Sequence, residues 1–434
     1  MHRGRYGAAE MTPVDSLNAA NMQSGLHPCR SCGGPLSVDM ADLGLQPPSN
    51  AYLVSLADAA AEKRYPLRAK VCGDCKLVQV DYDVSPSELF ANYAYFSSFS
   101  DSWLEHARAY CNMARDRFAL GDRSLVVELA SNDGYLLKNF LDMGIPVLGI
   151  DPSRTVALAA EKIGVPTLVE FFGNKVANAL VARGRRADLI IGNNVLAHVP
   201  DLNDFVAGIA TLLAPQGTVT IEFPHLLKLL EGVEFDTIYH EHFSYISLLA
   251  IEKVFERNEL RLYDVEQLPT HGGSLRVFAT HASYSDLRPS AKLEKVREGE
   301  VRAGLSDLNT YRDFSRRVIA CRESALAFLA DARTSGKVVC AYGAAAKGNT
   351  LLNFCAVTSD DIVMVADRNP HKQGKFLPGT HIPVVSPEVM LATKPDYVII
   401  LPWNLKSEIM DQLAEIRQWG GQFVVLVPEA KIIA

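Results

Sequence analysis

The sequence predicts an α/β fold in which two doubly wound parallel sheets follow a small metal-binding domain. Apolar stretches of strand length alternate with helical patterns from residue 125 onward, and a second such series begins at residue 338. Two Cys-x-x-Cys pairs precede both series. A chain of 434 residues is too long for one hydrophobic core, so we expect several domains.

The composition is that of a globular protein, with 48% hydrophobic and 21% charged residues. The net charge of −7 argues against a nucleic-acid partner, which favours a basic surface. No apolar run is long enough to span a membrane. The stretch before Pro28 contains Arg3 and Arg5 but no apolar core, so it is not a secretory signal. We expect a monomeric, cytoplasmic protein.

Four segments are expected along the chain. Residues 1–27 form a flexible tail and residues 28–90 a zinc-binding domain. Residues 91–283 form the first α/β domain. Residues 284–434 form a charged helical connector, expected to be solvated, and a second α/β domain.

Cys29, Cys32, Cys72 and Cys75 form two pairs that are typical of a zinc ribbon-like domain. Each pair supplies two thiolates from a tight turn, and two such pairs close a tetrahedral sulfur site. Because protein atoms fill all four positions, the zinc should be structural. The other cysteines lie in apolar segments, where we expect buried thiols and no disulfides; they are Cys111, Cys321, Cys340 and Cys355.

The first strand of the first α/β domain ends in a turn of small residues that includes Ala130 and Gly134. Small residues there let a ligand approach the backbone. The next strand ends in Asp151, whose carboxylate is placed to accept hydrogen bonds from ribose hydroxyls. Together with Glu128, this pattern indicates an adenosine ligand without a pyrophosphate, and S-adenosylmethionine fits best. The alternative is a strand–turn–helix that serves stability alone.

Polar side chains follow the next strand of this domain, at Asn193, Asn194 and His198. Ligands bind beyond the carboxyl ends of the strands in an open parallel sheet, so these residues should line the crevice. A satisfied surface or core position is the alternative for the histidine. Later in the chain, the segment beginning His271-Gly-Gly predicts a sharp loop near the sheet edge.

The richest polar cluster is Tyr239, His240, Glu241 and His242. An imidazole with a pKa near neutrality suits proton removal at physiological pH, so we favour a general base here. The spacing of the two histidines leaves zinc binding open, and a structural role is a further alternative.

Two other segments carry candidate ligand-binding residues. Tyr93 and Tyr95 lie in an aromatic segment, where their hydroxyls could reach a ligand or their rings could belong to a core. In the second α/β domain, Gly343 and Gly348 bracket a helix start that favours an anion such as phosphate. Lys347 could hold a diphosphate or could be an ordinary surface lysine. NAD is an alternative ligand, although only part of its glycine fingerprint is present.

Several blocks in this order resemble one known family, the sugar C-methyltransferases that place a methyl group on carbon 3 of nucleotide-linked 4-keto deoxysugars. The resemblance runs over nearly the whole chain from Pro28. It implies a class I methyltransferase Rossmann-like sheet, an N-terminal zinc ribbon-like domain and a C-terminal Rossmann-like domain. The blocks are the four cysteines, Tyr-Ala-Tyr-Phe-Ser-Ser, Ser-Asn-Asp-Gly-Tyr-Leu-Leu, Tyr-His-Glu-His-Phe-Ser-Tyr, His-Gly-Gly-Ser-Leu-Arg and Tyr-Gly-Ala-Ala-Ala-Lys-Gly-Asn.

The resemblance implies that a base removes the proton from carbon 3 of a thymidine-diphosphate (dTDP) ketosugar, and that the enolate attacks the methyl group of S-adenosylmethionine. His242 would be the base. Glu241 and Tyr239 would orient or polarise around it, and His198 and Tyr93 would stabilise the enolate. The cofactor-binding candidates are Glu128, Ala130, Asn132, Asp133, Gly134, Asp151 and Asn193. The substrate-binding candidates are Asn194, Tyr95, His271, Lys347 and Asn349.

Three alternatives stay open at this point. An O- or N-methyltransferase could act on the same kind of sugar. A non-catalytic, zinc-bearing nucleotide-binding or scaffold protein is disfavoured by the titratable cluster at the crevice. A metal-dependent hydrolase would use His240 and His242 as ligands. In the expected substrate, carbon 3 carries either an amino group or a hydroxyl.

Overall fold

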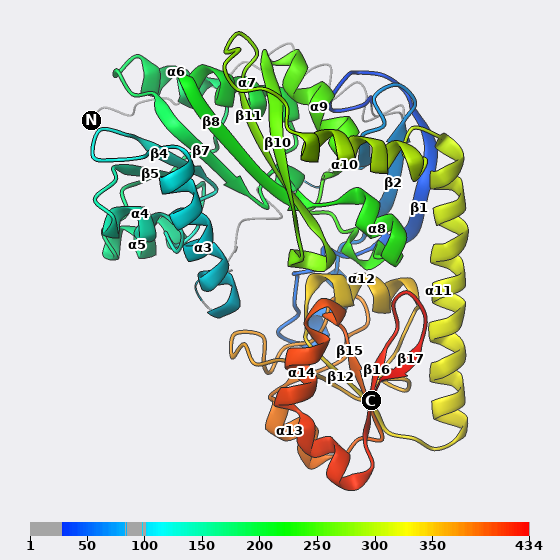
Figure 1. The fold of residues 1–434 in the computed structure, drawn as a ribbon. Helices are drawn as coiled ribbons and strands as arrows, with labels where there is room; N and C mark the ends of the chain where they lie inside the picture. The colour runs from blue at the N-terminus through cyan, green and yellow to red at the C-terminus, as the bar shows by residue number, and fades with distance from the viewer. Residues whose placement is uncertain (1–27, 83, 85–97, 99–100, 434) are drawn as a thin grey trace, which may run out of the picture.

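The computed structural model describes residues 28–82, 84, 98 and 101–433, and these residues build three sheets (Figure 1). Strand order is β1-β2-β3-β9 in the first sheet, β10-β11-β8-β7-β4-β5-β6 in the second and β14-β13-β12-β15-β16-β17 in the third. The predicted α/β fold is therefore confirmed.

The first sheet is antiparallel and follows the first cysteine pair. Its strands are β1 (Leu36–Gln46), β2 (Tyr65–Cys72), β3 (Val78–Val80) and β9 (Ser244–Tyr245), with a short 3-10 helix, η1 (Leu56–Ala61), between β1 and β2. Strand β9 lies two residues after the polar cluster of residues 239–242 and pairs Tyr245 with Val78. The first sheet therefore holds the segment that directly follows the cluster, which the sequence did not predict.

The second sheet has seven strands, of which only β11 runs antiparallel. From β4 the chain turns to β5 and β6 on one side and then to β7 and β8 on the other, so the switch point lies between β4 and β7. The strands are β4 (Val126–Leu129), β5 (Val147–Ile150), β6 (Thr167–Leu168), β7 (Ala187–Asn193), β8 (Leu213–Pro224), β10 (Leu260–Leu268) and β11 (Ser274–His281). Strands β4 and β5 are buried throughout, as expected for continuous apolar runs.

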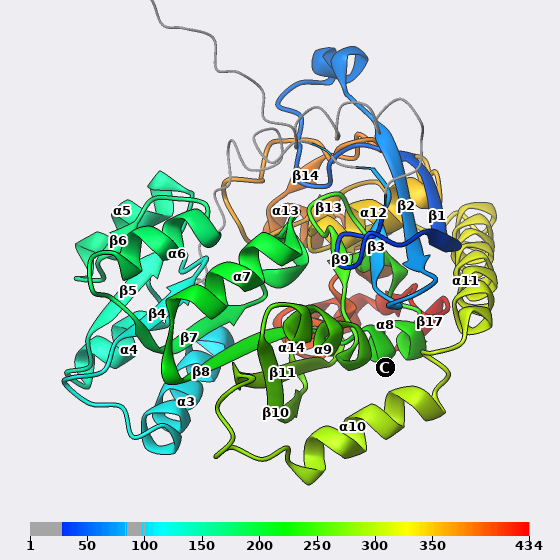
Figure 2. The ribbon, with the colours of Figure 1, turned by 90° about the horizontal axis from the view of Figure 1, so that it is seen from above.

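Helices cover both faces of this sheet (Figures 1 and 2). They are α3 (Asp101–Arg117), α4 (Leu137–Asp142), α5 (Arg154–Lys162), α6 (Asn174–Val181), α7 (Leu202–Leu212), α8 (Leu226–Gly232) and α9 (Leu248–Arg257), with short 3-10 helices η3 (Leu196–His198), η4 (Phe235–Thr237) and η5 (Thr270–Gly272). Residues 215–217 lie inside β8, whose pairing with β7 is irregular nearby.

Two helices, α10 (Ala291–Arg302) and α11 (Leu308–Thr334), connect to the third sheet. Helix α11 runs along the molecule beside both the first and the third sheet (Figures 1 and 2). The expectation of a solvated connector is wrong for α11, because one of its faces recurs at helical spacing and is buried. That face consists of Tyr311, Phe314, Val318, Cys321, Ala325, Leu329 and Ala332.

The third sheet is parallel except for its edge strand β17. Its strands are β12 (Val339–Tyr342), β13 (Val365–Ala366), β14 (Val384–Val385), β15 (Tyr397–Ile400), β16 (Gln422–Val425) and β17 (Lys431–Ile433). Its helical segments are α12 (Ala346–Phe354), α13 (Pro387–Ala392), η6 (Trp403–Leu405), α14 (Lys406–Gln412) and η7 (Ala414–Trp419).

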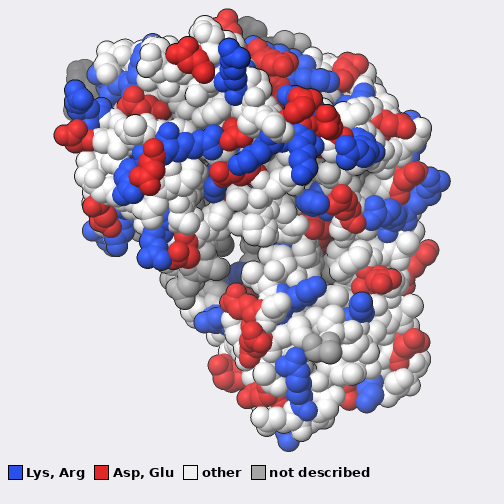
Figure 3. Space-filling view, in the orientation of Figure 1, with Lys and Arg blue, Asp and Glu red and all other residues white. Residues whose placement is uncertain are grey.

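The face drawn in Figure 3 carries Lys and Arg interspersed with Asp and Glu, and is hollowed where the second and third sheets meet. Across the described ranges, none of the helices has the length and apolar character needed to cross a bilayer.

Candidate active site

Three carboxyl groups meet at the carboxyl ends of β4 and β5, those of Glu128, Asp133 and Asp151, all at most 6% exposed. Burial, and then the charges of Asp151 and Asp133, raise the pKa of Glu128 well above its usual value. Glu128 Oε2 and Asp133 Oδ1 accept no hydrogen bond from the part of the chain that the structure describes. Such buried acceptors suit the hydroxyl and amino groups of an adenosine ligand.

Asp151 braces the turn that follows β4. Its Oδ2 accepts a hydrogen bond from the backbone N–H of Asn132 at 2.9 Å, and its Oδ1 accepts one from Ser153 at 2.8 Å. Each carboxylate oxygen retains a second lone pair for a ribose hydroxyl.

The turn itself has three residues with positive φ, namely Ala130 (56°), Asn132 (50°) and Gly134 (79°). A Cβ at Gly134 would lie 3.0 Å from Cγ2 of Val165. Glycine is therefore required here by backbone conformation and by packing, rather than by the room for a ligand that the sequence suggested.

Asn193 is the last residue of β7 and Asn194 follows it, beside the switch point. Asn194 has φ 54° and donates its N–H to the carbonyl of Glu222 at 2.7 Å. The buried Oδ1 atoms of both asparagines accept no hydrogen bond from other described residues, so they are available to a ligand in the crevice.

His242 and Tyr239 form a hydrogen-bonded pair. The Nδ1 of His242 lies 2.9 Å from the carbonyl of Thr237, which can only accept, so Nδ1 carries the proton. Nε2 therefore accepts the hydrogen bond from the Tyr239 hydroxyl at 2.9 Å. This arrangement places a basic nitrogen and a phenolic donor side by side.

His198 lies against His242 edge to face, with ring centroids 4.8 Å apart. Its Nδ1 donates to the carbonyl of Glu241 at 2.7 Å. Burial lowers the pKa of His198 to about 4, and burial followed by the charge of His198 lowers the pKa of His242. Both rings are therefore uncharged at pH 7. Their pKa values lie further below 7 than the sequence alone suggested. A neutral His198 presents an acceptor at Nε2 and can donate to an enolate only after it takes up a proton.

The side chain of Glu241 points to the zinc-bearing sheet. Its two carboxylate oxygens accept hydrogen bonds from Asn50 Nδ2 at 2.8 and 3.0 Å. Burial raises the pKa of Glu241 to about 7, and the hydrogen bond from Asn50 opposes that shift. Glu241 is therefore an acid that titrates close to physiological pH.

His240 faces away from this group. It is 1% exposed, its Nε2 donates to the carbonyl of Pro66 at 3.2 Å, and its ring meets Tyr65 edge on. Among the described residues, the four paired cysteines form the one cluster of three or more groups that could hold a metal ion.

The cysteine cluster fits zinc. Sγ of Cys29 lies 3.4 Å from Sγ of Cys75, Sγ of Cys32 lies 3.4 Å from Sγ of Cys72, and all four atoms lie within 4.8 Å of one another. Zn–S bonds of about 2.3 Å in a tetrahedron require sulfur atoms roughly 3.8 Å apart. None of the eight cysteines forms a disulfide, and the four outside the cluster are buried, as predicted.

Lys347 lies in an aromatic and acidic setting. Its Nζ donates to Oδ1 of Asn404 at 2.7 Å and lies 4.2 Å from the ring centroid of Trp403. Trp403 in turn donates Nε1–H to the buried carboxyl of Asp236 at 2.8 Å. Burial lowers the pKa of Lys347, while Asp236 and Glu234 oppose that shift. These contacts join the third sheet to the segment that leads to His242.

Asn349 is 1% exposed and donates Nδ2–H to the carbonyl of Ser49 at 2.6 Å. Its Oδ1 accepts no hydrogen bond from the residues that the structure describes. His271 has φ 56°, and its ring lies edge to face against Trp103 of α3, with centroids 5.5 Å apart. Tyr93 and Tyr95 lie outside the described residues.

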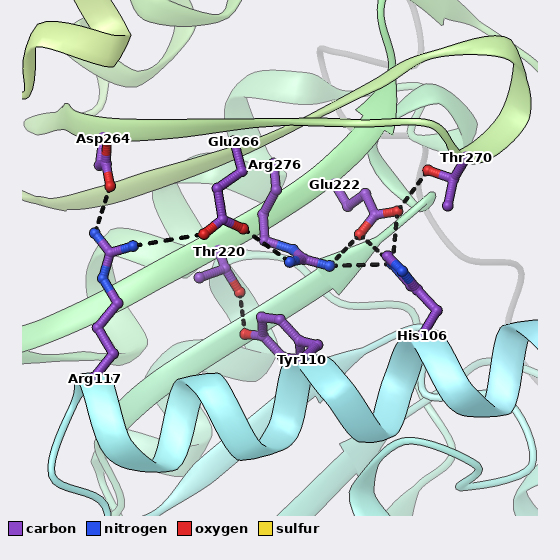
Figure 4. A network of polar contacts seen from close by, with 9 residues as sticks. All are labelled: His106, Tyr110, Arg117, Thr220, Glu222, Asp264, Glu266, Thr270 and Arg276. Atoms are coloured by element: carbon purple, nitrogen blue, oxygen red, sulfur yellow. Dashed lines mark hydrogen bonds and ion pairs between the residues drawn. The ribbon is translucent and has the colours of Figure 1, made fainter.

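A buried polar network holds α3 against the edge of the second sheet (Figure 4). At its centre Arg276 of β11 donates to Glu222 of β8 at 2.7 Å and to Glu266 of β10 at 3.0 Å. His106 of α3 donates to Glu222 at 2.9 Å, and Thr270 donates to the same carboxylate at 3.1 Å. The network thereby fixes both α3 and the loop that carries His271.

Sequence reasoning missed Asn50, Trp403 and Glu222 as parts of this region. Asn50 follows Pro47-Pro48-Ser49, and Trp403 follows Pro402 at a strand end. Both patterns predict a turn, but neither indicates a role in binding or catalysis. Glu222 is a lone acid inside an apolar strand, which is the signal that could have found it.

Three family models match the chain. Residues 29–90 match a zinc binding domain, residues 103–265 a methyltransferase domain and residues 269–428 the C-methyltransferase C-terminal domain. These matches, the seven-stranded sheet and the buried carboxyl groups of Glu128, Asp133 and Asp151 define an S-adenosylmethionine-dependent methyltransferase of the class I fold. These residues fit the cofactor, because Glu128 Oε2 and Asp133 Oδ1 are buried acceptors that can take hydrogen bonds from the hydroxyl and amino groups of its adenosine.

The C-methyltransferase NovU of Streptomyces niveus is 37% identical over 407 residues, which cover 94% of this chain and 96% of that protein. The chain belongs to this family of C-methyltransferases. A shorter match, 29% identical over 97 residues, is to the ubiquinone biosynthesis O-methyltransferase of Rhodopseudomonas palustris, and covers 22% of this chain and 38% of that enzyme.

Among solved structures, an S-adenosylmethionine-dependent methyltransferase from Clostridium acetobutylicum aligns with a TM-score of 0.35 at 12% identity, over 45% of this chain and 97% of that chain. The PH0226 protein from Pyrococcus horikoshii aligns with a TM-score of 0.37 at 16% identity, over 45% and 98%.

Proposed function

We propose that this C-methyltransferase places a methyl group on carbon 3 of a dTDP-linked 4-keto deoxysugar. The observation that carries the proposal is the pair of Tyr239 and His242, in which a neutral Nε2 and a phenolic hydroxyl lie 2.9 Å apart. A carbon acid beside a ketone needs a base for its proton and a donor for the developing oxyanion, whereas an oxygen or nitrogen nucleophile needs much less.

His242 Nε2 takes the proton from carbon 3, while Nδ1 keeps its own proton and donates it in a hydrogen bond to the carbonyl of Thr237. The Tyr239 hydroxyl, which donates its hydrogen bond to Nε2 in the free enzyme, donates it instead to the ketone oxygen at carbon 4 and so stabilises the enolate. S-adenosylmethionine supplies an electrophilic methyl group when bound. Glu128, Asp133 and Asp151 would hold this cofactor, whose sulfonium would supply the methyl group for carbon 3 and keep the electron pair of the broken carbon–sulfur bond. General base action contributes about 100- to 10,000-fold, and positioning of the reactants on the order of 7–11 kcal/mol.

The two ends of the substrate have separate candidate partners. Lys347 and Asn349 are proposed for the nucleotide end, since both lie where the third sheet meets the segment of Tyr239 and His242. Asn194 and His271 are proposed for the sugar end, together with Tyr93 and Tyr95, which the sequence alone suggests. The acidic edge of the second sheet, from Glu128 to Asp151, is proposed for the cofactor.

A small panel of dTDP-linked 4-keto deoxysugars, with an amino group or a hydroxyl at carbon 3, tests the proposal. Product mass should rise by one methyl group, and NMR should place that group on carbon 3. A product methylated on oxygen or nitrogen, or no turnover of any member, would overturn it.

A further inference from the structure

The loop that follows β1, residues 47–52, belongs to the zinc-bearing unit and lies between the two α/β sheets. From this loop Asn50 donates Nδ2–H to both carboxylate oxygens of Glu241, at 2.8 and 3.0 Å. The carboxyl group of Glu241 is buried, and the residue is 5% exposed. A hydrogen bond to a buried carboxyl group fixes its position strongly, since removal of the donor leaves that group unsatisfied.

A second hydrogen bond links Glu241 to the histidines. The backbone carbonyl of Glu241 accepts the Nδ1–H of His198 at 2.7 Å, and the ring of His198 lies against His242. The zinc-bearing unit is therefore linked to His242 by a series of contacts. Asn50 is hydrogen-bonded to the side chain of Glu241, the backbone of Glu241 is hydrogen-bonded to His198, and the ring of His198 packs against His242.

The loop is itself held from the other side. The carbonyl of Ser49 accepts a hydrogen bond from Asn349 at 2.6 Å, and the Tyr52 hydroxyl donates to the carbonyl of Ala344. Ala344 directly precedes the N-cap of α12 and Asn349 lies in its first turn, so both partners belong to the α/β unit of the third sheet. The loop thus has defined positions relative to both sheets.

We propose that Asn50 is a positioning residue for methyl transfer, which places Glu241 and through it His198 and His242. The inference rests on the roles proposed above for these histidines. It assigns to the zinc-bearing unit a part in positioning the catalytic histidines, beyond holding its metal.

The first test compares Asn50→Ala with Arg64→Ala in the full-length, zinc-loaded enzyme. Arg64 makes another contact between the same unit and the α/β unit of the third sheet, a hydrogen bond to the carbonyl of Gly379 at 3.0 Å, and it takes no part in the hydrogen bonds that join Asn50, Glu241 and His198. Asn50→Ala should lower kcat at least about tenfold while the Kd for S-adenosylmethionine stays within about twofold. Arg64→Ala should leave kcat near that of the wild type. Unchanged kcat in Asn50→Ala would overturn the proposal.

A double-mutant cycle separates positioning through Glu241 from a general structural effect. If Asn50 acts through Glu241, the variant with both Asn50→Ala and Glu241→Gln should have nearly the kcat of Glu241→Gln alone. Additive losses would show that Asn50 acts by another route and would overturn the assignment.

Crystal structures of the wild type and Asn50→Ala test the inference without turnover. The carboxyl group of Glu241 and the ring of His198 should shift in the variant. If both keep their places, the inference is wrong whatever the substrate is. If they shift but the wild type methylates no ketosugar, only the proposed function fails.

Discussion

His198 and His242 pack edge to face with ring centroids 4.8 Å apart, and each donates its Nδ1 proton to a backbone carbonyl. These bonds select one tautomer in both rings and leave Nε2 as the basic nitrogen. Burial keeps the rings neutral. The protein thus holds two imidazoles ready to accept protons within one partly buried cluster.

Replacement of His242 with Asn should abolish turnover without loss of cofactor binding. The amide lacks a basic nitrogen, so general base catalysis of about 100- to 10,000-fold is lost. Calorimetric titration with S-adenosylmethionine should give a Kd close to that of the wild type. Normal methylation by the variant would remove His242 from the role of base.

The pH dependence of stability should reveal Glu241. Its pKa is raised to about 7 in the folded protein, above the ordinary value of 4.5 for a glutamate, so the folded state holds the proton more tightly. This stabilisation is fully present below pH 4.5 and is lost as the pH rises through 7. The free energy of unfolding of the wild type, relative to Glu241→Gln, should fall by roughly 3 kcal/mol between pH 4.5 and pH 8. A flat difference would contradict the pKa shift.

Loss of the metal should unfold the first sheet. Cys72→Ser removes a thiolate that is 0% exposed, and structural zinc stabilises its fold strongly. The variant should lose its zinc and much of its activity, because β9 joins the zinc-bearing sheet to the segment of His242. Metal analysis should find one zinc in the wild type and in the control Cys111→Ser, which alters a buried core thiol. Two tightly bound zinc ions per chain would instead favour histidine ligands.

The polar network of Figure 4 should contribute strongly to stability. Arg276→Ala leaves the carboxylate of Glu222 buried and only partly satisfied, which should cost about 3–5 kcal/mol of unfolding free energy. Arg108→Ala breaks an exposed ion pair with Glu105 on the same α3 helix and should change stability by no more than about 1 kcal/mol. Urea denaturation of both variants measures the difference, and equal effects would contradict the account.

Local patterns in the sequence predicted much of this structure. The strands at 126–129 and 147–150 follow from apolar runs, which are properties of neighbouring residues. The cysteine cluster follows from the spacing of two pairs, because each pair forms a turn by itself.

The contacts that assemble the site join residues far apart in the chain, and no local pattern encodes them. Asn50 and Glu241 are 191 positions apart, and Asp236 and Trp403 are 167 positions apart. Likewise, two-residue β9 is too short to carry a strand pattern, and its pairing with β3 depends on the tertiary fold.

Exchange of the carbon 3 proton with solvent tests whether His242 removes this proton before the methyl group is transferred. The enzyme is incubated in deuterated water with a dTDP-linked 4-keto deoxysugar and no S-adenosylmethionine, and deuterium at carbon 3 is followed by NMR. The wild type should exchange this proton far faster than a blank without enzyme, and His242→Asn should not. Methylated product formed by an enzyme that leaves the carbon 3 proton in place would contradict the account.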